Sequence, residues 1–137
     1  RFLYCKRNPV DNGLSIFKQD FLNSHSYATK LEDIAHFTSM ERQVMKMWME
    51  QYEEDIHVVE YEKLVSNFDE ETKKIFEFTD LSWSEDVKYF YKSQRYCNTA
   101  SFDQVRQPVY DNSIELHKKY SSELGVLREH LLQYGVK

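Results

Sequence analysis

The chain has 137 residues, 41% of them hydrophobic and 15% aromatic, which suffices for one compact domain but is short for two. Its 18 lysines and arginines face 23 aspartates and glutamates, and the net charge of −5 argues against a general nucleic-acid-binding surface, which requires excess basic charge. No apolar run approaches the roughly 20 residues that span a bilayer. Cys5 and Cys97 are too few for a disulfide framework and lack metal-site spacing. We therefore expect reduced thiols, no metal, no membrane segment and no nucleic-acid partner. We expect a cytoplasmic location, or the Golgi lumen if the source is eukaryotic.

The first predicted elements are a strand over residues 1–7 (RFLYCKR) and a helix from Pro9 to about Leu22. Asn8 is a good N-cap, and proline suits the first helical position. One apolar stripe follows the helical period, at Val10, Leu14, Phe17 and Phe21. The strand therefore delivers Arg7 to a strand-to-helix turn, where a ligand would lie.

The middle of the chain predicts a long helix, a strand and a third helix. The long helix runs from Leu31 to Tyr52, and its apolar residues are expected in the core: Ile34, Phe37, Val44, Met45, Trp48 and Tyr52. Residues 55–62 (DIHVVEYE) are β-branched and short, which indicates a second buried strand with Tyr61 near its exit. Ser66 or Asn67 can cap the next helix, FDEETKKIFEF.

The last third predicts a short helix over residues 84–93, a loop over 94–110 and a helix over 113–135 with a break near Ser121 and a stop at Gly135. This element order is typical of an α/β fold with parallel strands. Two strands make a poor sheet, so we expect the remaining strands of the same domain upstream of Arg1.

The carboxyl ends of parallel strands are the usual ligand position in such sheets, so Arg7 and Tyr61 are expected to share a crevice. A guanidinium can bind a phosphate with two hydrogen bonds, and the free N–H groups of the helix at Pro9 would add to the field. Ser15 lies about two turns along the helix. Gly13 costs about 1 kcal/mol relative to alanine there, which predicts close packing against its backbone. Each residue also has an ordinary explanation, as a surface arginine, a helix-face serine or a packing glycine.

Three segments together resemble PAPS-dependent sulfotransferases. RNPVDNGLSIF is similar to their 3′-phosphate-binding segment, in which a strand-end arginine precedes a helix serine by eight residues. VVEYEKLV resembles the family's next strand. TASFDQVRQPVY resembles the loop that closes over the nucleotide in tyrosylprotein sulfotransferases and in bacterial sulfotransferases fused to tetratricopeptide repeats.

The resemblance implies that Arg7 and Ser15 hold the 3′-phosphate and that Tyr61 lies by the adenosine. It also implies that residues 101–110 cover the nucleotide, with contacts from Ser101, Gln104, Val105 and Arg106. On the chemistry of this last segment alone, an ordinary surface loop with an Asn-Thr-Ser turn is the alternative.

The chain departs from the family's pattern in two places. Gln19 stands where relatives often have a basic residue, and Leu116-His117 stands where others place a basic residue before an aromatic one. The family's phosphosulfate loop and catalytic base precede the strand equivalent to residues 1–7, so the catalytic residues are unknown. None of the five histidines has a paired carboxylate or a nucleophile at catalytic spacing: His25, His36, His57, His117 and His130.

The sequence therefore predicts that residues 1–137 are the C-terminal half of a P-loop-like α/β sulfotransferase domain. The complete enzyme would move a sulfuryl group from PAPS to a hydroxyl or amine acceptor by in-line attack, without a metal, and this half would supply the nucleotide-binding wall. Two alternatives remain: part of a P-loop nucleotide or small-molecule kinase, and a non-catalytic helical interaction module with the Leu31–Tyr52 helix as its partner surface.

Overall fold

The computed structural model describes residues 1–19, 21, 25–93 and 104–136, and the chain divides into two compact units. The strand unit comprises residues 1–6 and 55–112, and the helix unit comprises residues 7–54 and 113–137. Whether both belong to one larger domain, as the sequence predicts, stays a prediction. None of the described helices is long and apolar enough to cross a membrane.

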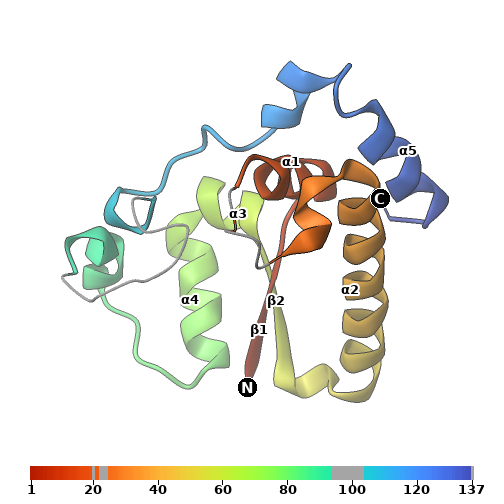
Figure 1. Ribbon diagram of the computed structural model, residues 1–137. Coiled ribbons are helices and arrows are strands. Elements are labelled where there is room, and N and C mark those ends of the chain that lie inside the picture. The colour runs from red at the N-terminus through yellow and green to blue at the C-terminus, as the bar shows by residue number, and fades with distance from the viewer. Residues whose placement is uncertain (20, 22–24, 94–103, 137) are drawn as a thin grey trace. The chain divides into compact units, whose positions relative to one another are not determined.

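The strand unit is built on a parallel pair, β1 (Phe2–Lys6) and β2 (Ile56–Glu60), which lie side by side in Figure 1. In their register Phe2 pairs with Ile56 and Lys6 with Glu60. α3 (Tyr61–Ser66) and α4 (Phe68–Phe78) follow β2. The predicted mixture of helices with a parallel sheet is confirmed.

The prediction that β2 is a buried strand is wrong for most of its residues. Only Val59 is buried there, and the apolar side chains of β1 are open to solvent, with Phe2 61% and Leu3 43% exposed. Two paired strands make backbone hydrogen bonds to each other only along the edges that face each other. Within the described residues no third strand joins them. The β-branched pattern thus predicted the position of the strand but not the extent of its burial.

The helices of the strand unit follow the predictions except in capping. Asn67 stands at the N-cap of α4, but its side chain makes no capping hydrogen bond. The predicted short helix is confirmed as a 3-10 helix, η3 (Glu85–Lys92). A short 3-10 turn, η4 (Gln104–Arg106), lies within the predicted loop, and another, η2 (Glu53–Asp55), precedes β2 in the chain.

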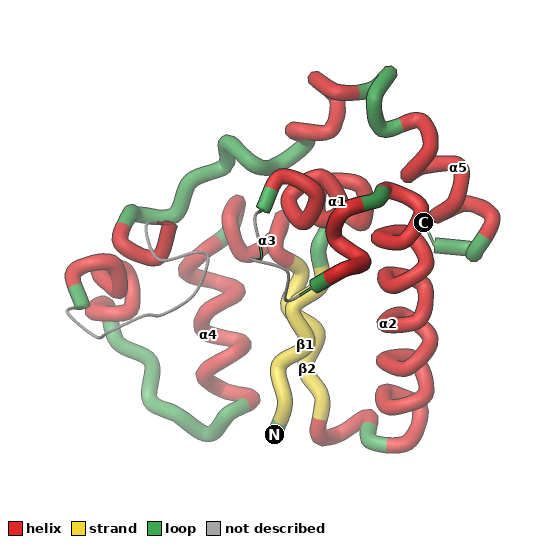
Figure 2. The backbone as a smooth tube through the Cα atoms, viewed as in Figure 1, coloured by secondary structure: helices red, strands yellow, loops and turns green. Residues whose placement is uncertain are grey.

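The helix unit begins with α1 (Pro9–Lys18) and the 3-10 turn η1 (Ser26–Thr29), followed by the long α2 (Leu31–Gln51), all drawn in red in Figure 2. The predicted bounds of α2 are confirmed to within one residue. α1 ends at Lys18, short of the expected end near residue 22, because Gln19 adopts an extended backbone.

The last part of the helix unit is η5 (Leu116–Tyr120) and α5 (Gly125–Gln133), which confirms a break near Ser121. The predicted stop is also confirmed, since Gly135 has φ 72°, a left-handed conformation that glycine adopts without strain. The core gathers apolar residues of three helices and the flanking turns: Leu14, Ile34, Ala35, Leu124, Leu127, Leu131 and Val136.

Gly13 is tightly packed against other side chains of this core. A Cβ built on it would lie 2.6 Å from Leu127 Cδ2 and 3.4 Å from Ile34 Cγ2. The expectation that something packs tightly against Gly13 is confirmed, and the partners are the buried side chains of α5 and α2.

The expectation that the apolar residues of α2 belong to the core holds only near its N-terminus. Ile34 is fully buried, but the side chains further along are 41–63% exposed: Phe37, Met40, Val44, Met47, Trp48 and Tyr52. The buried face of α2 consists of Ile34, Ala35, Thr38 and Ser39. The helical period predicted which face of α2 is apolar. Only the N-terminal part of that face packs against the core.

Candidate functional site

The strand-to-helix turn forms where the sequence predicts it. The carboxamide Oδ1 of Asn8 accepts hydrogen bonds from the N–H groups of Val10, at 2.9 Å, and Asp11, at 3.1 Å, and Pro9 has no N–H to satisfy. The predicted Asn8 cap is therefore confirmed, and the N–H groups of Val10 and Asp11, which were expected to add to the field as free donors, are already hydrogen-bonded. The dipole of α1 still gives its N-terminus a positive electrostatic potential, which favours a nearby anion.

Arg7, immediately before this cap, is partly buried and held in two ways. Its Nη2 donates to the Ser113 carbonyl at 2.7 Å, and its own carbonyl accepts from Arg42 Nη2 at 2.9 Å. One contact orients the side chain, and the other fixes the backbone. A guanidinium carries several N–H donors in a fixed plane, which is the geometry that suits the oxygens of an anion.

Ser15 lies further along α1 and is exposed. At 1.5 Å per residue it is about 9 Å along the helix axis from Pro9, so an anion that touches both Arg7 and Ser15 must lie beside the first two turns. The residues on the other side of the helix, Gly13 and Leu14, are buried. The hydroxyl is thus available to a ligand beside α1.

A buried carboxylate, which the sequence did not single out, lies one turn into α1. The side chain of Asp11 is 1% exposed. Its Oδ2 accepts from the Glu115 N–H and its Oδ1 from the His117 N–H, both at 2.8 Å. The sequence offered only a weak signal, because Asp11 lies three positions before Leu14 and so on a neighbouring part of the same helix face.

The expectation that no histidine has a paired carboxylate is wrong for His117. Its Nδ1 lies 2.9 Å from Asp11 Oδ1, and its side chain is 15% exposed. The geometry of this contact is not that of a hydrogen bond. The two residues are 106 positions apart, so no sequence spacing could reveal the pair.

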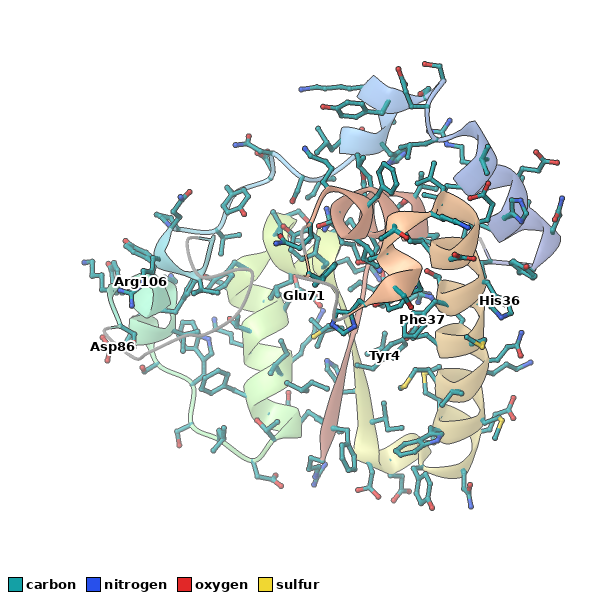
Figure 3. All side chains as sticks on the ribbon, in the orientation of Figure 1. Tyr4, His36, Phe37, Glu71, Asp86 and Arg106 are labelled. Carbon is teal, nitrogen blue, oxygen red and sulfur yellow. The ribbon has the colours of Figure 1, made fainter. Side chains whose placement is uncertain are left out.

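The remaining predicted site residues belong to the strand unit. Tyr61 opens α3 directly after β2 and is half-buried. Val105 and Arg106 are exposed on η4, where Figure 3 labels Arg106. Ser101 lies outside the described residues, as does the side chain of Gln104.

Arg7 and Ser15 thus belong to the helix unit, whereas Tyr61 and the η4 residues belong to the strand unit. The shared crevice stays a prediction. Among the described residues, no group of three or more His, Cys, Asp or Glu side chains could hold a metal ion. An open hollow of about 560 Å³ in the helix unit contains none of the predicted ligands; it is lined by Phe17, Gln19, Phe21, His25, Ser26, Ala28 and Thr29.

Comparison with known proteins gives two matches. The model of a family described as "Sulfotransferase family" matches residues 1–85, which include Arg7, Ser15 and Tyr61 but not the 101–110 segment. A protein of Aquifex aeolicus (strain VF5), described as uncharacterized, is 31% identical over 140 residues. That alignment covers the whole chain but only 18% of the relative's length. No solved structure matches the chain.

Proposed function

The chain belongs to the sulfotransferase family, and from that membership we propose that it forms the 3′-phosphoadenosine-binding wall of an enzyme that uses PAPS. The complete enzyme would transfer the sulfuryl group to a hydroxyl or amine acceptor. We further propose that the parallel pair β1 and β2 belongs to a P-loop-like sheet, of which residues 1–137 form the C-terminal half.

The observation that carries this proposal is the fixed position of Arg7. It stands between the end of β1 and the capped start of α1, with its backbone held by Arg42 and its guanidinium oriented by Ser113. An arginine held in this way loses little further conformational entropy when it binds a phosphate. A partly buried guanidinium also binds an anion more strongly than one in open water.

The donor set of the chain fits PAPS. Arg7 and the exposed hydroxyl of Ser15 would hold the 3′-phosphate, because both donate to phosphate oxygens. Tyr61 offers an aromatic ring to the adenosine. Bound PAPS supplies the sulfuryl group that is transferred.

The predicted cover over the nucleotide is the 101–110 segment. Its proposed contacts combine a hydroxyl, an amide, an apolar side chain and a guanidinium, from Ser101, Gln104, Val105 and Arg106. Such a mixture satisfies both phosphate oxygens and base edges.

The test is nucleotide selectivity in the full-length protein. Since the proposed contacts are made to the 3′-phosphate, 3′-phosphoadenosine 5′-phosphate should bind about tenfold or more tightly than AMP, the effect of one or two charge-assisted hydrogen bonds. Isothermal calorimetry measures both affinities. Equal affinities would remove the assignment of Arg7 and Ser15.

One observation favours the alternative of a helical interaction module. The exposed apolar residues of α2, from Phe37 to Tyr52, form a surface that another polypeptide segment could cover. A protein that binds neither nucleotide in calorimetry would support that alternative. No observation favours a kinase.

A further inference from the structure

A short segment next to Arg7 is held by the helix that carries the proposed phosphate ligands. We name residues Ser113–His117 the strap. Three hydrogen bonds join the strap to α1 and the turn before it: Asp11 accepts from the N–H groups of Glu115 and His117, and Arg7 donates to the carbonyl of Ser113. Arg7 and Asp11, which are four positions apart, thus hold the two ends of the strap.

The Asp11 contacts are strong for a physical reason. A carboxylate that is 1% exposed has lost its water and must be fully hydrogen-bonded by the protein. Here each carboxylate oxygen has its own backbone N–H at 2.8 Å, and the His117 ring lies 2.9 Å away. Charge-assisted bonds of this kind are shorter and stronger than neutral ones.

The backbone of the strap is strained at Glu115, one of the residues that Asp11 holds. Glu115 has φ 57°, in the left-handed region that residues with a side chain rarely adopt. Such a conformation persists only where surrounding contacts enforce it. The N–H of Glu115 itself donates to Asp11, so the contact that fixes the strap lies on its strained residue.

We propose that Asp11 is a positioning residue for anion binding by Arg7. By holding the strap, Asp11 places the Ser113 carbonyl, and that carbonyl orients the Arg7 guanidinium. Without Asp11 the strap moves, the guanidinium loses its orientation, and binding of a 3′-phosphate weakens. This inference rests on the proposed function, because it assigns Asp11 a role in that same site.

The first experiment uses Asp11→Asn in the full-length protein. The amide keeps the shape but offers one acceptor oxygen, so one of the two strap bonds is lost. The affinity for 3′-phosphoadenosine 5′-phosphate should fall roughly tenfold, and that for AMP should stay unchanged. Asp33→Asn is the matched control: Asp33 is also in the first turn of a helix but is exposed, and its change should leave both affinities unaltered.

The outcomes separate the two proposals. If the wild-type protein shows no preference for the 3′-phosphorylated nucleotide, the proposed function fails whatever Asp11 does. If the wild type shows the preference and Asp11→Asn retains it in full, the positioning role is overturned. An equal loss of both affinities would make Asp11 a purely structural residue and would also overturn the inference.

A second measurement needs no variant and covers the case in which Asp11→Asn does not fold. Coupling between two sites is reciprocal, so if the strap supports anion binding, the anion must stabilise the strap. Hydrogen exchange of the Glu115 and His117 amides in the wild-type protein should slow more with 3′-phosphoadenosine 5′-phosphate than with AMP, each at saturation. Equal slowing by the two nucleotides would overturn the inference.

Discussion

Under the proposed function, the Arg7 side chain contributes both to the folded chain and to ligand binding. Its contact with Ser113 joins segments 106 residues apart, and under the proposed function the same guanidinium also donates to the phosphate. A substitution at Arg7 therefore removes a structural bond together with the proposed ligand bonds, and the two losses must be measured separately.

We expect Arg7→Ala to weaken binding of 3′-phosphoadenosine 5′-phosphate about tenfold or more, with a stability loss of about 1 kcal/mol for each structural hydrogen bond that is removed. Arg7→Lys should restore binding in part, because an ammonium keeps the charge but not the planar pair of donors. Calorimetry and thermal unfolding measure the two effects. Unchanged binding per folded molecule, together with a large stability loss, would make Arg7 structural.

A second prediction at this scale concerns Gly13. Gly13→Ala should destabilise the protein by about 1 kcal/mol or more, because overpacking against the fully buried Leu127 outweighs the gain in helix propensity. Gly125→Ala is the matched control, since a Cβ there meets nothing within 4 Å. Thermal unfolding measures both variants. A Gly13→Ala protein as stable as the Gly125→Ala protein would contradict the packing argument.

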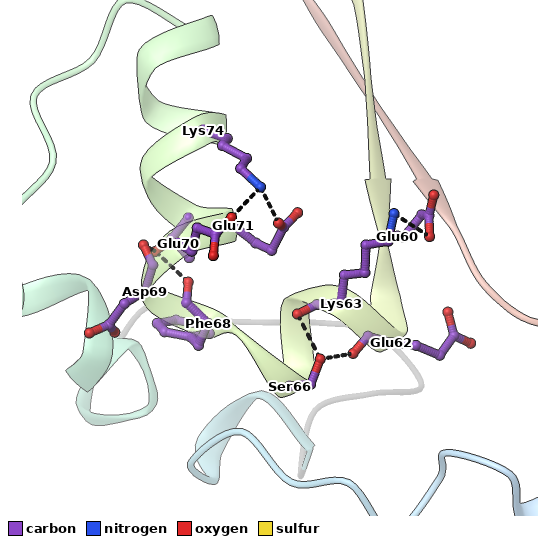
Figure 4. A network of polar contacts seen from close by, with 10 residues as sticks. Glu60, Glu62, Lys63, Ser66, Phe68, Asp69, Glu70, Glu71 and Lys74 are labelled. Atoms are coloured by element: carbon purple, nitrogen blue, oxygen red, sulfur yellow. Dashed lines mark hydrogen bonds and ion pairs between the residues drawn. The ribbon is translucent and has the colours of Figure 1, made fainter.

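At the scale of elements, Lys74 on α4 makes two ion pairs, one with the exposed Glu70 and one with the buried Glu71. Figure 4 shows Lys74 between Glu70 and Glu71, with both carboxylates 2.7 Å from the ammonium. The hydrogen bond from Lys74, reinforced by its charge, holds the pKa of Glu70 below the ordinary value of 4.5. The two glutamates in turn raise the pKa of Lys74.

An NMR titration should therefore give Glu70 a pKa below 4.5, and Lys74→Ala should return it toward that value. This pKa shift makes the free energy of unfolding depend on pH. A carboxyl whose pKa is lower in the folded state stabilises the fold at pH values above its unfolded pKa. That contribution is lost as the pH falls through the folded pKa. Lys73→Ala is the control, because Lys73 lies over the Trp83 ring, 4.8 Å from its centroid. A Glu70 titration unaffected by Lys74→Ala would refute the pairing.

The long helix α2 illustrates the limit of periodicity at the same scale. Its apolar stripe from Phe37 to Tyr52 has the helical spacing of a core-facing surface, yet these side chains are largely exposed. A stripe records which face of a helix is apolar, whereas the packing partner decides how much of it is covered. The first turns of α2 find that partner in α1 and α5, through Ile34 and Ala35.

For the whole molecule, each compact unit leaves apolar surface open. Phe2, Leu3 and Val58 of the strand pair are 36–61% exposed, and the chain corresponds to only 18% of the length of its Aquifex relative. Under the proposed function, residues 1–137 supply the nucleotide-binding wall, and we assign neither phosphosulfate binding nor the catalytic base to any of them.

We therefore expect residues 1–137, expressed alone, to lack sulfotransferase activity and to unfold without a cooperative transition. Loss of one electrostatic donor typically lowers a rate about 100- to 1,000-fold, and here donors and base would be missing together. The measurements are transfer of radiolabelled sulfate to hydroxyl and amine acceptors, and thermal unfolding, each beside the full-length protein as control. Turnover by the isolated segment would show that the catalytic residues lie within it.

The sequence by itself determined the local structure and the candidate ligands. Asn8 and Pro9 set the start of α1, the apolar period set the bounds of α2, and the β-branched run set β2, because capping, periodicity and backbone preference act between near neighbours. The three motifs likewise indicated the sulfotransferase family, which the match over residues 1–85 confirms.

Only the tertiary structure decided which distant segments meet. It joined Asp11 to His117 and Arg7 to Ser113 across 106 residues, filled the space beside Gly13 with Leu127, and left the face of α2 from Phe37 onward exposed. Such contacts depend on how whole elements pack, and a buried carboxylate finds its hydrogen-bond donors wherever the packed chain brings them. No spacing along the chain encodes that position, because residues so far apart become neighbours only when the helices between and around them have assembled.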